Sequence, residues 1–304
     1  MNQLAKPRLL TLVVNERSGG GRAGRMLPKV ARRLREQIPT AELHIISSNS
    51  WTEAEKLTRA AAMEARPGDA LLVMGGDGMA HLGLNAAAGT EATLGLIPAG
   101  TGNDFARGVG VPRTVDEAVG VIVAGRTRTV DLARISNDTF PRRYVGAVVS
   151  TGYDARVNRS TNHIRLRLGA LSYGYIALRE LASFSPLHYD MIIDGVRRRQ
   201  EAMLVAVSNT GIFGGGMRIA PEADPTDGLL DVTVVGPVSR TTLLRLLPAM
   251  YSGAFVRHPC VEQFPARSIE LAGGGLFVMG DGEELGEVPV RVECVPGVLK
   301  VFVA

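Results

Sequence analysis

Two glycine-rich segments, each with one carboxylate, are the residues of this chain best suited to chemistry. The first is Gly75-Gly76-Asp77-Gly78 and the second is Gly100-Thr101-Gly102-Asn103-Asp104. Glycine lets backbone N–H groups approach an anion closely and permits positive φ angles without strain. A turn that leads into a helix adds the positive end of that helix, so phosphate is the expected ligand. Together the two segments predict a nucleotide triphosphate site built from two loops.

The elements that must position these loops alternate between strands and helices. Alternation of this kind predicts a parallel sheet of βαβ units, whose ligands bind at the carboxyl ends of the strands. A third glycine-rich loop, 15–24, would lie at the same edge as 75–78 and 100–104. We expect strands at 9–14, 42–47, 70–74 and 94–97, and helices at 26–37, 52–65, 79–88 and 114–124.

After residue 131 the pattern changes to short, β-branched segments separated by turn residues, which predicts a mostly antiparallel second domain. Helical insertions are expected at 164–184 and 239–250, and the hinge between the domains near 126–136. The expected strands are 144–150, 187–194, 202–208, 229–235, 268–271, 276–279, 288–294 and 298–303.

Composition excludes several classes of protein. The 304 residues carry a net charge of +4 and only 5% aromatic residues, with no basic stripe, which argues against a nucleic-acid partner. No window approaches eighteen uncharged apolar residues, so no membrane span is predicted. Cys260 and Cys294 are expected to be free thiols in a reducing compartment, and we predict a cytoplasmic protein.

Five motifs in a fixed order resemble those of a known family. They are Asn15-Glu16-Arg17-Ser18-Gly19, the two glycine segments above, Pro221-x-Ala223 with Asp227-Gly228-Leu229, and Asp281-Gly282-Glu283. Over essentially its whole length the chain resembles the soluble bacterial lipid kinases of the diacylglycerol-kinase catalytic-domain family, which includes sphingosine and ceramide kinases. The resemblance implies an α/β protein. Its N-terminal Rossmann-like, NAD-kinase-like parallel-sheet domain would span 1–130 and be joined by 295–304. A C-terminal β-sandwich domain for the lipid would span 131–294.

The implied activity is transfer of the γ-phosphoryl group of ATP, with Mg²⁺, to the hydroxyl of a lipid such as diacylglycerol or phosphatidylglycerol. The family pattern differs at two positions, with Glu16 where a proline is usual and Met79 where a threonine is usual. The nucleotide-binding residues expected from the loops and the resemblance are Asn15, Glu16, Arg17, Ser18, Gly19, Ser48, Gly75, Gly76, Asp77, Gly78, Met79, Gly100, Thr101, Gly102, Asn103 and Asp104.

Three acids are candidates for the catalytic base. On the residues alone, Asp281-Gly282 favours a two-residue hairpin turn. The resemblance instead assigns essential carboxylates to this motif, with Glu283 as the base and Asp281 beside it. Asp77 is the alternative base, or else orients the phosphate cradle and magnesium. Since the loops belong to the first domain and Asp281 and Glu283 to the second, we expect the reaction in the cleft between them.

A turn rich in acids is a candidate metal site. Asp224 and Asp227 are three residues apart, and the carbonyl of Leu229 follows, which together offer the oxygen ligands that Mg²⁺ prefers. The alternative is an exposed acidic turn without a metal. By resemblance, a structural magnesium ion binds here, apart from the one carried by the nucleotide.

Two segments suggest contact with lipid. The basic end of 163–184, with Arg142 and Arg143, could rest on anionic headgroups, although packing as an ordinary amphipathic helix is favoured. The apolar segment 243–251 could line an acyl groove, although core packing is again favoured. We expect a lipid substrate reached by peripheral membrane contact, and the sequence leaves a homodimer open. Two other functions compete: an NAD kinase, and a catalytically silent nucleotide- or lipid-binding regulator.

Overall fold

The computed structural model divides the chain into two compact units, which are described separately. All residues are described except 1, 4–6, 49, 138–141, 154 and 158–184, so the expected helix 164–184 lies outside the described residues. The first unit comprises residues 1–132, 225–227 and 295–304, and the second comprises 133–224 and 228–294.

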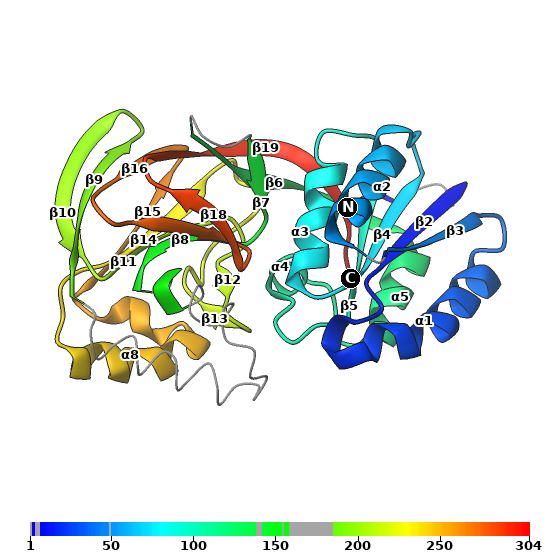
Figure 1. The fold of residues 1–304 in the computed structure, drawn as a ribbon, viewed down its shortest axis with the longest axis horizontal. Coiled ribbons are helices and arrows are strands. Elements are labelled where there is room, and N and C mark those ends of the chain that lie inside the picture. The colour runs from blue at the N-terminus through cyan, green and yellow to red at the C-terminus, as the bar shows by residue number, and fades with distance from the viewer. Residues whose placement is uncertain (1, 4–6, 49, 138–141, 154, 158–184) are drawn as a thin grey trace. The chain divides into compact units, whose positions relative to one another are not determined.

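The first unit is built on a parallel sheet (Figure 1). Its strand order is β5-β4-β2-β3, and the end of β19 pairs in parallel with β5. The short strand β1 (Asn2–Gln3) pairs with the first residues of β6. The main strands are β2 (Leu9–Val14), β3 (Glu42–Ser47), β4 (Ala70–Gly75), β5 (Thr93–Pro98), β6 (Arg126–Ser136) and β19 (Val290–Phe302).

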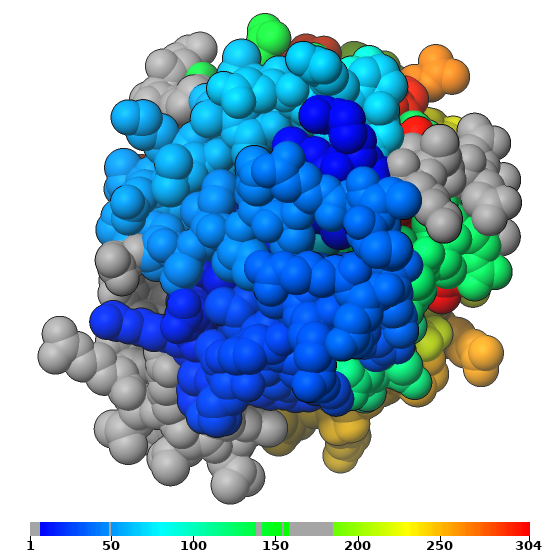
Figure 2. All heavy atoms as spheres, turned by 90° about the vertical axis from the view of Figure 1, so that its right-hand side faces the viewer, coloured from blue at the N-terminus to red at the C-terminus, as the bar shows by residue number. Residues whose placement is uncertain are grey.

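Helices cover both faces of this sheet. Side chains of α1 and α5, such as Leu34 and Ile122, join one core cluster with Leu12 and Leu72 of the strands. On the opposite face α3 lies so close to the sheet that a side chain on Gly83 would meet Val73. The helices are α1 (Ser18–Gln37), α2 (Trp51–Met63), α3 (Asp77–Ala87), α4 (Asp104–Gly108) and α5 (Val115–Ala124). In Figure 2 most of the visible surface has the blue colours of the N-terminal residues, as expected where β3 is the edge strand.

The second unit is a sandwich of antiparallel strands. One sheet has the order β15-β14-β11-β8-β17-β18, and the facing strands β10, β9, β16 and β19 pair in that order. Val205 and Val232 of the first sheet share a core cluster with Met191 and Ile269 of the second, so the two inner faces pack together. The predicted fold class, a parallel-sheet domain followed by a β sandwich, is confirmed.

The elements of the second unit include short hairpins and one long helix. Helix α8 lies against the sheet that contains β11 and β14 (Figure 1). The elements are β7 (Arg143–Val145), β8 (Val148–Gly152), β9 (Leu187–Ile193), β10 (Val196–Ala202), β11 (Leu204–Ser208), β12 (Ile212–Phe213), β13 (Met217–Arg218), β14 (Leu230–Val235), α8 (Arg240–Ser252), the 3₁₀ helix η1 (Ala254–Arg257), β15 (Val261–Ala266), β16 (Ser268–Ala272), β17 (Phe277–Gly280) and β18 (Glu283–Glu287).

Several sequence-based expectations need correction. The loop 75–78 is shorter than predicted, because α3 already begins at Asp77. The first unit ends at residue 132 and the second begins at 133, within the predicted hinge 126–136, but this segment is the continuous strand β6. The predicted strands 288–294 and 298–303 form one strand, β19. Strands β10 and β18 were not predicted, since charged residues replace the apolar alternation in them, and neither was β15, in which a proline follows Glu-Gln-Phe.

Candidate active site

Three loops of the first unit meet at the carboxyl ends of β2, β4 and β5. The amides of Ala99 and Gly100 both donate to the carbonyl oxygen of Gly75, at 2.7 and 3.1 Å, and the amide of Asn15 donates to Met74 O at 3.3 Å. These bonds join the loops that follow β5 and β2 to the end of β4. The structure therefore brings together the glycine loops that the sequence placed at one sheet edge.

The closest approach between two of these loops requires glycine. A Cβ atom on Gly100 would lie 2.4 Å from the Cα of Gly76, a separation that real Cβ atoms do not show. In the same way a Cβ on Gly19, whose φ is +60°, would lie 2.1 Å from the carbonyl oxygen of Ala99. Backbone thus packs directly on backbone, which leaves N–H groups rather than side chains to line the edge.

The carboxylate of Asp77 binds the loop 100–104, which follows β5. Its two oxygens accept hydrogen bonds from the amides of Asn103 (2.9 Å) and Asp104 (2.6 Å). Asn103 is left-handed, with φ 55°, and its side-chain amide bonds both the N–H and the C=O of Gly100. Asp77 and Asn103 therefore fix the conformation of the loop that ends in Asp104.

Asp77 and Asp104 also bring negative charge to one place. A Cβ on Gly102 would lie 2.4 Å from Asp77 Oδ2 and 3.6 Å from Asp104 Oδ2, so both oxygens border the same point. Two carboxylates in such a position repel each other, and a cation relieves the repulsion. Magnesium bound to a nucleotide takes one or two carboxylates in addition to phosphate oxygens and water. These residues therefore fit a nucleotide-bound Mg²⁺.

The loop that follows β2, which begins at Asn15, is held by its own side chains. Asn15 Oδ1 accepts from the amide of Arg17, and Glu16 accepts from Ser47 Oγ at 2.7 Å, so the glutamate that stands in place of proline connects the loop to the end of β3. Gly19, Gly20 and Gly21 follow with positive φ angles of 60°, 66° and 83°. The expected loop 15–24 is thus a short turn and a left-handed glycine run at the start of α1.

Other predicted nucleotide residues differ in what their side chains contact. The Ser48 hydroxyl donates to the carbonyl of Ser50 and forms a hydrogen bond with Glu53, so it contacts residues at the start of α2. Met79 is buried, and a Cβ on Gly75 would lie 2.4 Å from its Cγ, so its side chain packs beneath Gly75. Thr101 is exposed. At position 79, therefore, only the backbone remains to contact a phosphate.

In the second unit, Asp281 and Gly282 form the turn between β17 and β18. Their φ angles are 51° and 85°, which is the conformation of a two-residue hairpin turn. The Asp281 carboxylate accepts from the amides of Gly146 (2.9 Å) and Ala147 (2.8 Å). Glu283, the first residue of β18, is exposed, and within the described residues its carboxylate makes no hydrogen bond or ion pair. The hairpin interpretation is therefore right for the backbone, and it leaves Glu283 accessible.

Asn209 belongs to the same arrangement and was not predicted. Its buried side-chain NH₂ donates to Gly146 O at 3.0 Å, and its backbone N–H donates to Ala147 O at 2.9 Å. Asp281 holds the N–H groups of these two residues, and Asn209 holds their carbonyl groups. An Asn that ends the apolar stretch Leu204–Ser208 and precedes Gly211 was the available sequence signal.

The expected metal ligands Asp224, Asp227 and Leu229 lie in the loop between β13 and β14. Asp224 and Leu229 belong to the second unit, whereas Asp227 belongs to the first. Across the described residues no group of three His, Cys, Asp or Glu side chains is arranged to hold a metal ion. A site that includes the Leu229 carbonyl stays a prediction.

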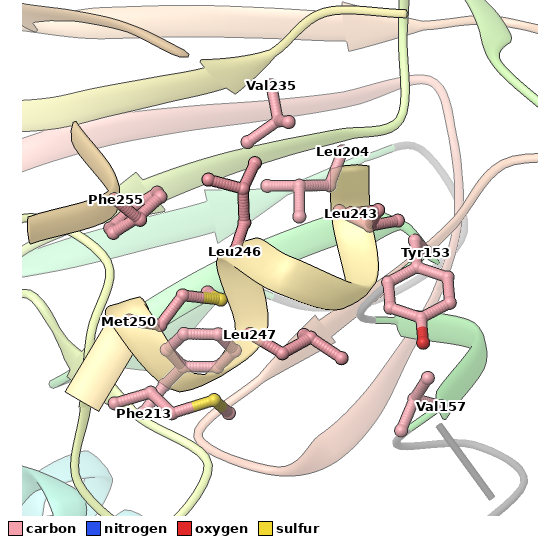
Figure 3. A pocket seen from close by; sticks show the side chains of 11 residues that line it. Tyr153, Val157, Leu204, Phe213, Val235, Leu243, Leu246, Leu247, Met250 and Phe255 are labelled. Carbon is pink, nitrogen blue, oxygen red and sulfur yellow. The ribbon is translucent and has the colours of Figure 1, made fainter. Parts of the chain in front are cut away.

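An apolar pocket lies between α8 and the sheet of the second unit (Figure 3). Leu243, Leu246 and Met250 project from α8 toward Leu204 of β11 and Val235 of β14. Phe213, Met217 and Phe255 also line the pocket, and among the lining residues that the structure describes only Tyr153 has a polar side chain. One side of segment 243–251 therefore does both things considered for the segment, since Leu243, Leu246 and Met250 are buried against the core and also line the pocket.

Comparison with known proteins gives two family matches that together span the chain. Residues 9–135 match the diacylglycerol kinase catalytic domain. Residues 147–303 match the YegS C-terminal NAD kinase beta sandwich-like domain.

Individual relatives agree with these matches. A diacylglycerol kinase of Mycobacterium tuberculosis is 36% identical, over 96% of this chain and 94% of the relative. A diacylglycerol kinase of Bacillus subtilis is 27% identical, with 80% of each chain covered. A solved structure from Bacillus anthracis str. Sterne has a TM-score of 0.81 and 25% identity, and covers 99% of this chain and 98% of that one.

Proposed function

Because this chain belongs to the diacylglycerol-kinase-like family of lipid kinases, we propose that it transfers the γ-phosphoryl group of ATP to the hydroxyl of a lipid such as diacylglycerol or phosphatidylglycerol. The observation that carries the proposal is the meeting of three glycine loops at one edge of the first unit's sheet, where Asp77 and Asn103 fix the loop 100–104.

The loops supply what a triphosphate needs. Helix α3 starts at this edge without a side-chain cap, so the backbone N–H groups of its first turn are available to an anion. Glycine contacts between the loops keep Cβ atoms away from this edge. We therefore assign the β- and γ-phosphates to the Gly76–Met79 turn and the Gly100–Gly102 segment.

Magnesium fits beside Asp77 and Asp104. When bound there with the nucleotide, it would neutralise charge on the phosphates. Asp77 would act mainly through the loop that it holds, since both of its oxygens accept backbone hydrogen bonds. A second, structural Mg²⁺ at Asp224, Asp227 and the Leu229 carbonyl is a further part of the proposal.

Glu283 is the residue we assign as general base. Its carboxylate is exposed, whereas the Asp281 carboxylate is occupied by Gly146 and Ala147. In the reaction the lipid hydroxyl loses its proton to Glu283, the lipid oxygen bonds to the γ-phosphorus, and the bond to the β-phosphate oxygen breaks to release ADP. Asp281 would set the position of the turn that carries Glu283.

The apolar pocket beneath α8 supports a lipid rather than a dinucleotide as acceptor. Its described lining offers one polar side chain, that of Tyr153, whereas a nicotinamide dinucleotide needs many hydrogen-bond partners. We propose that an acyl chain of the substrate lies along Leu243, Leu246 and Met250. Peripheral contact with a membrane follows from this proposal, since the substrate resides there.

The test uses labelled ATP and Mg²⁺ with three acceptors: diacylglycerol, phosphatidylglycerol and NAD. Label in the organic phase supports the proposal, label in the dinucleotide supports an NAD kinase, and label that stays on ATP supports a silent regulator.

Glu283→Gln should lower kcat by at least about 100-fold with ATP affinity retained, as expected for loss of a general base. Glu284→Gln, at the adjacent exposed position, is the matched control and should keep wild-type rates. Wild-type turnover by Glu283→Gln would remove the assignment.

A further inference from the structure

Helix α8 has apolar side chains on two sides. One side lines the pocket through Leu243, Leu246 and Met250 (Figure 3). On the other side Leu244 is 42% exposed and Tyr251 is 55% exposed, and Pro248 between them is also exposed. Residues at i, i+4 and i+7 share one stripe of a helix, so these three side chains form an outer apolar stripe. Packing on the sheet requires only the inner side.

The charged residues of this stretch of the chain have one sign. The sequence from Val232 to Val261 contains no Asp or Glu. Arg240 and Arg245 of α8 and Arg257 of η1 are exposed, and none of them forms an ion pair within the described part of the chain. In contrast, the arginines of β10 are neutralised, since Arg197 pairs with Asp190 and Arg198 with Glu262. The surface of α8 thus combines exposed apolar side chains with positive charges that form no ion pair among the described residues.

We propose that the outer stripe of α8 (Leu244, Pro248 and Tyr251), with Arg240 and Arg245, docks the protein on an anionic membrane surface. The proposal rests on the proposed function, which places the acceptor lipid in a membrane. No helix among the described residues is long and apolar enough to span a bilayer. A helix with apolar residues on one side and arginines beside them can instead lie in the plane of the membrane surface. Leu244 and Tyr251 would enter the headgroup region, where tyrosine is favoured, and the arginines would contact lipid phosphates.

Co-sedimentation of the full chain with unilamellar vesicles tests this surface. One set of vesicles contains phosphatidylcholine alone, and the other contains phosphatidylcholine with phosphatidylglycerol. We expect binding to the anionic vesicles that weakens with salt. Leu244→Ser with Tyr251→Ser should reduce binding at least about ten-fold through lost apolar burial. Arg240→Gln with Arg245→Gln should reduce it about five-fold for each charge removed, on anionic vesicles alone.

The matched control is Met63→Ser with Val196→Ser. These side chains are 75% and 70% exposed, which is more than Leu244 or Tyr251, and they lie outside α8. The control should bind vesicles as the wild type does. Equal losses in control and test variants, wild-type binding by the Leu244/Tyr251 variant, or no vesicle binding by the wild type would each overturn the proposal. So would a dimer in solution that only the Leu244/Tyr251 variant dissociates, because a second copy would then cover the stripe.

A kinase assay separates this proposal from the proposed function. With a dispersed short-chain diacylglycerol the α8 variants should keep wild-type rates, whereas with vesicle-embedded diacylglycerol they should lose activity in parallel with binding. If the wild type phosphorylates neither substrate but still binds vesicles through α8, the proposed function fails and the docking surface stands. Wild-type activity of the Leu244/Tyr251 variant on vesicles would contradict the docking surface alone.

Discussion

In three aspartates of this chain the carboxylate accepts hydrogen bonds from the backbone amides of two consecutive residues. Asp77 accepts from the amides of residues 103 and 104, Asp281 from those of residues 146 and 147, and Asp194 from those of residues 267 and 268. Asp194 lies at the turn between β9 and β10, where no chemistry is proposed. The arrangement is therefore a structural device, and its presence at Asp77 and Asp281 leaves Glu283 as the predicted acid available for proton transfer.

The role of Asp77 can be tested by replacing its carboxylate with the amide of asparagine. Asp77→Asn keeps one acceptor and turns an NH₂ group toward a backbone N–H, so the loop around Asn103 should loosen. Loss of a charge-assisted bond is worth about 2 kcal/mol, and we expect ATP affinity to fall at least about ten-fold by calorimetry. Asp194→Asn is the control, since it breaks the same contact elsewhere and should leave ATP affinity unchanged. Unchanged affinity with a collapse of kcat in Asp77→Asn would instead identify Asp77 as the base.

Asn209 should act on catalysis through the backbone it holds. In Asn209→Ala the carbonyl of Gly146 loses its buried donor, which costs about 1–3 kcal/mol of stability. The turn that carries Glu283 then loses one side of its support, so we expect kcat to fall with little change in the KM for ATP. Thr233→Val, which removes a buried hydrogen bond to Ile219, should lower stability to a similar degree without lowering kcat. Equal kcat in both variants would make Asn209 a purely structural residue.

At the scale of elements, sequence reasoning succeeded where apolar residues alternate regularly with turns. Strands β2 and β3 have the predicted bounds because both are bordered by clear breakers. It failed for β10, whose Val-Arg-Arg-Arg sequence has no buried face to reveal and is held by ion pairs to Asp190 and Glu262. The glycine loops were located, but the contact between Gly76 and Gly100 depends on packing between distant segments. No local pattern contains that information.

The hairpin of β9 and β10 should make stability depend on acid. The Arg197 guanidinium, with Arg199 nearby, lowers the pKa of Asp190 to about 2. Because the folded pKa lies below the ordinary value, the ion pairs stabilise the fold above about pH 4 and are lost as the pH falls toward 2. Urea midpoints measured from pH 6 to pH 2 should therefore fall more steeply for the wild type than for Asp190→Asn. Parallel pH profiles of the two proteins would contradict this account.

At the scale of the whole molecule, both units are assembled from separated segments of the chain. The first unit takes residues 225–227 and 295–304 from regions that follow the second unit in sequence. Residues 225 and 226 are held by β6, through a 2.7 Å bond from the amide of Asp131 to Pro225 O and a 2.9 Å bond from Arg128 to Thr226. Gly297 likewise donates to Asp131 at 2.7 Å. A chain cut at residue 132 would lack these partners, which is why the final segment belongs with the nucleotide loops.

Phe302 provides the sharpest test of that assembly. Its ring is fully buried in the core cluster with Leu10, Leu72 and Ile122, although only two residues follow it in the sequence. Phe302→Ala leaves a cavity there and should lower the free energy of unfolding by about 3–5 kcal/mol. Lys300→Ala, on the same strand but half-buried, should change it by less than about 1 kcal/mol. Because a nucleotide stabilises only the unit that binds it, saturating ATP with Mg²⁺ should raise the melting temperature of Phe302→Ala and recover part of the loss. If Phe302→Ala melts like the wild type, the C-terminal strand is not part of the first unit's core.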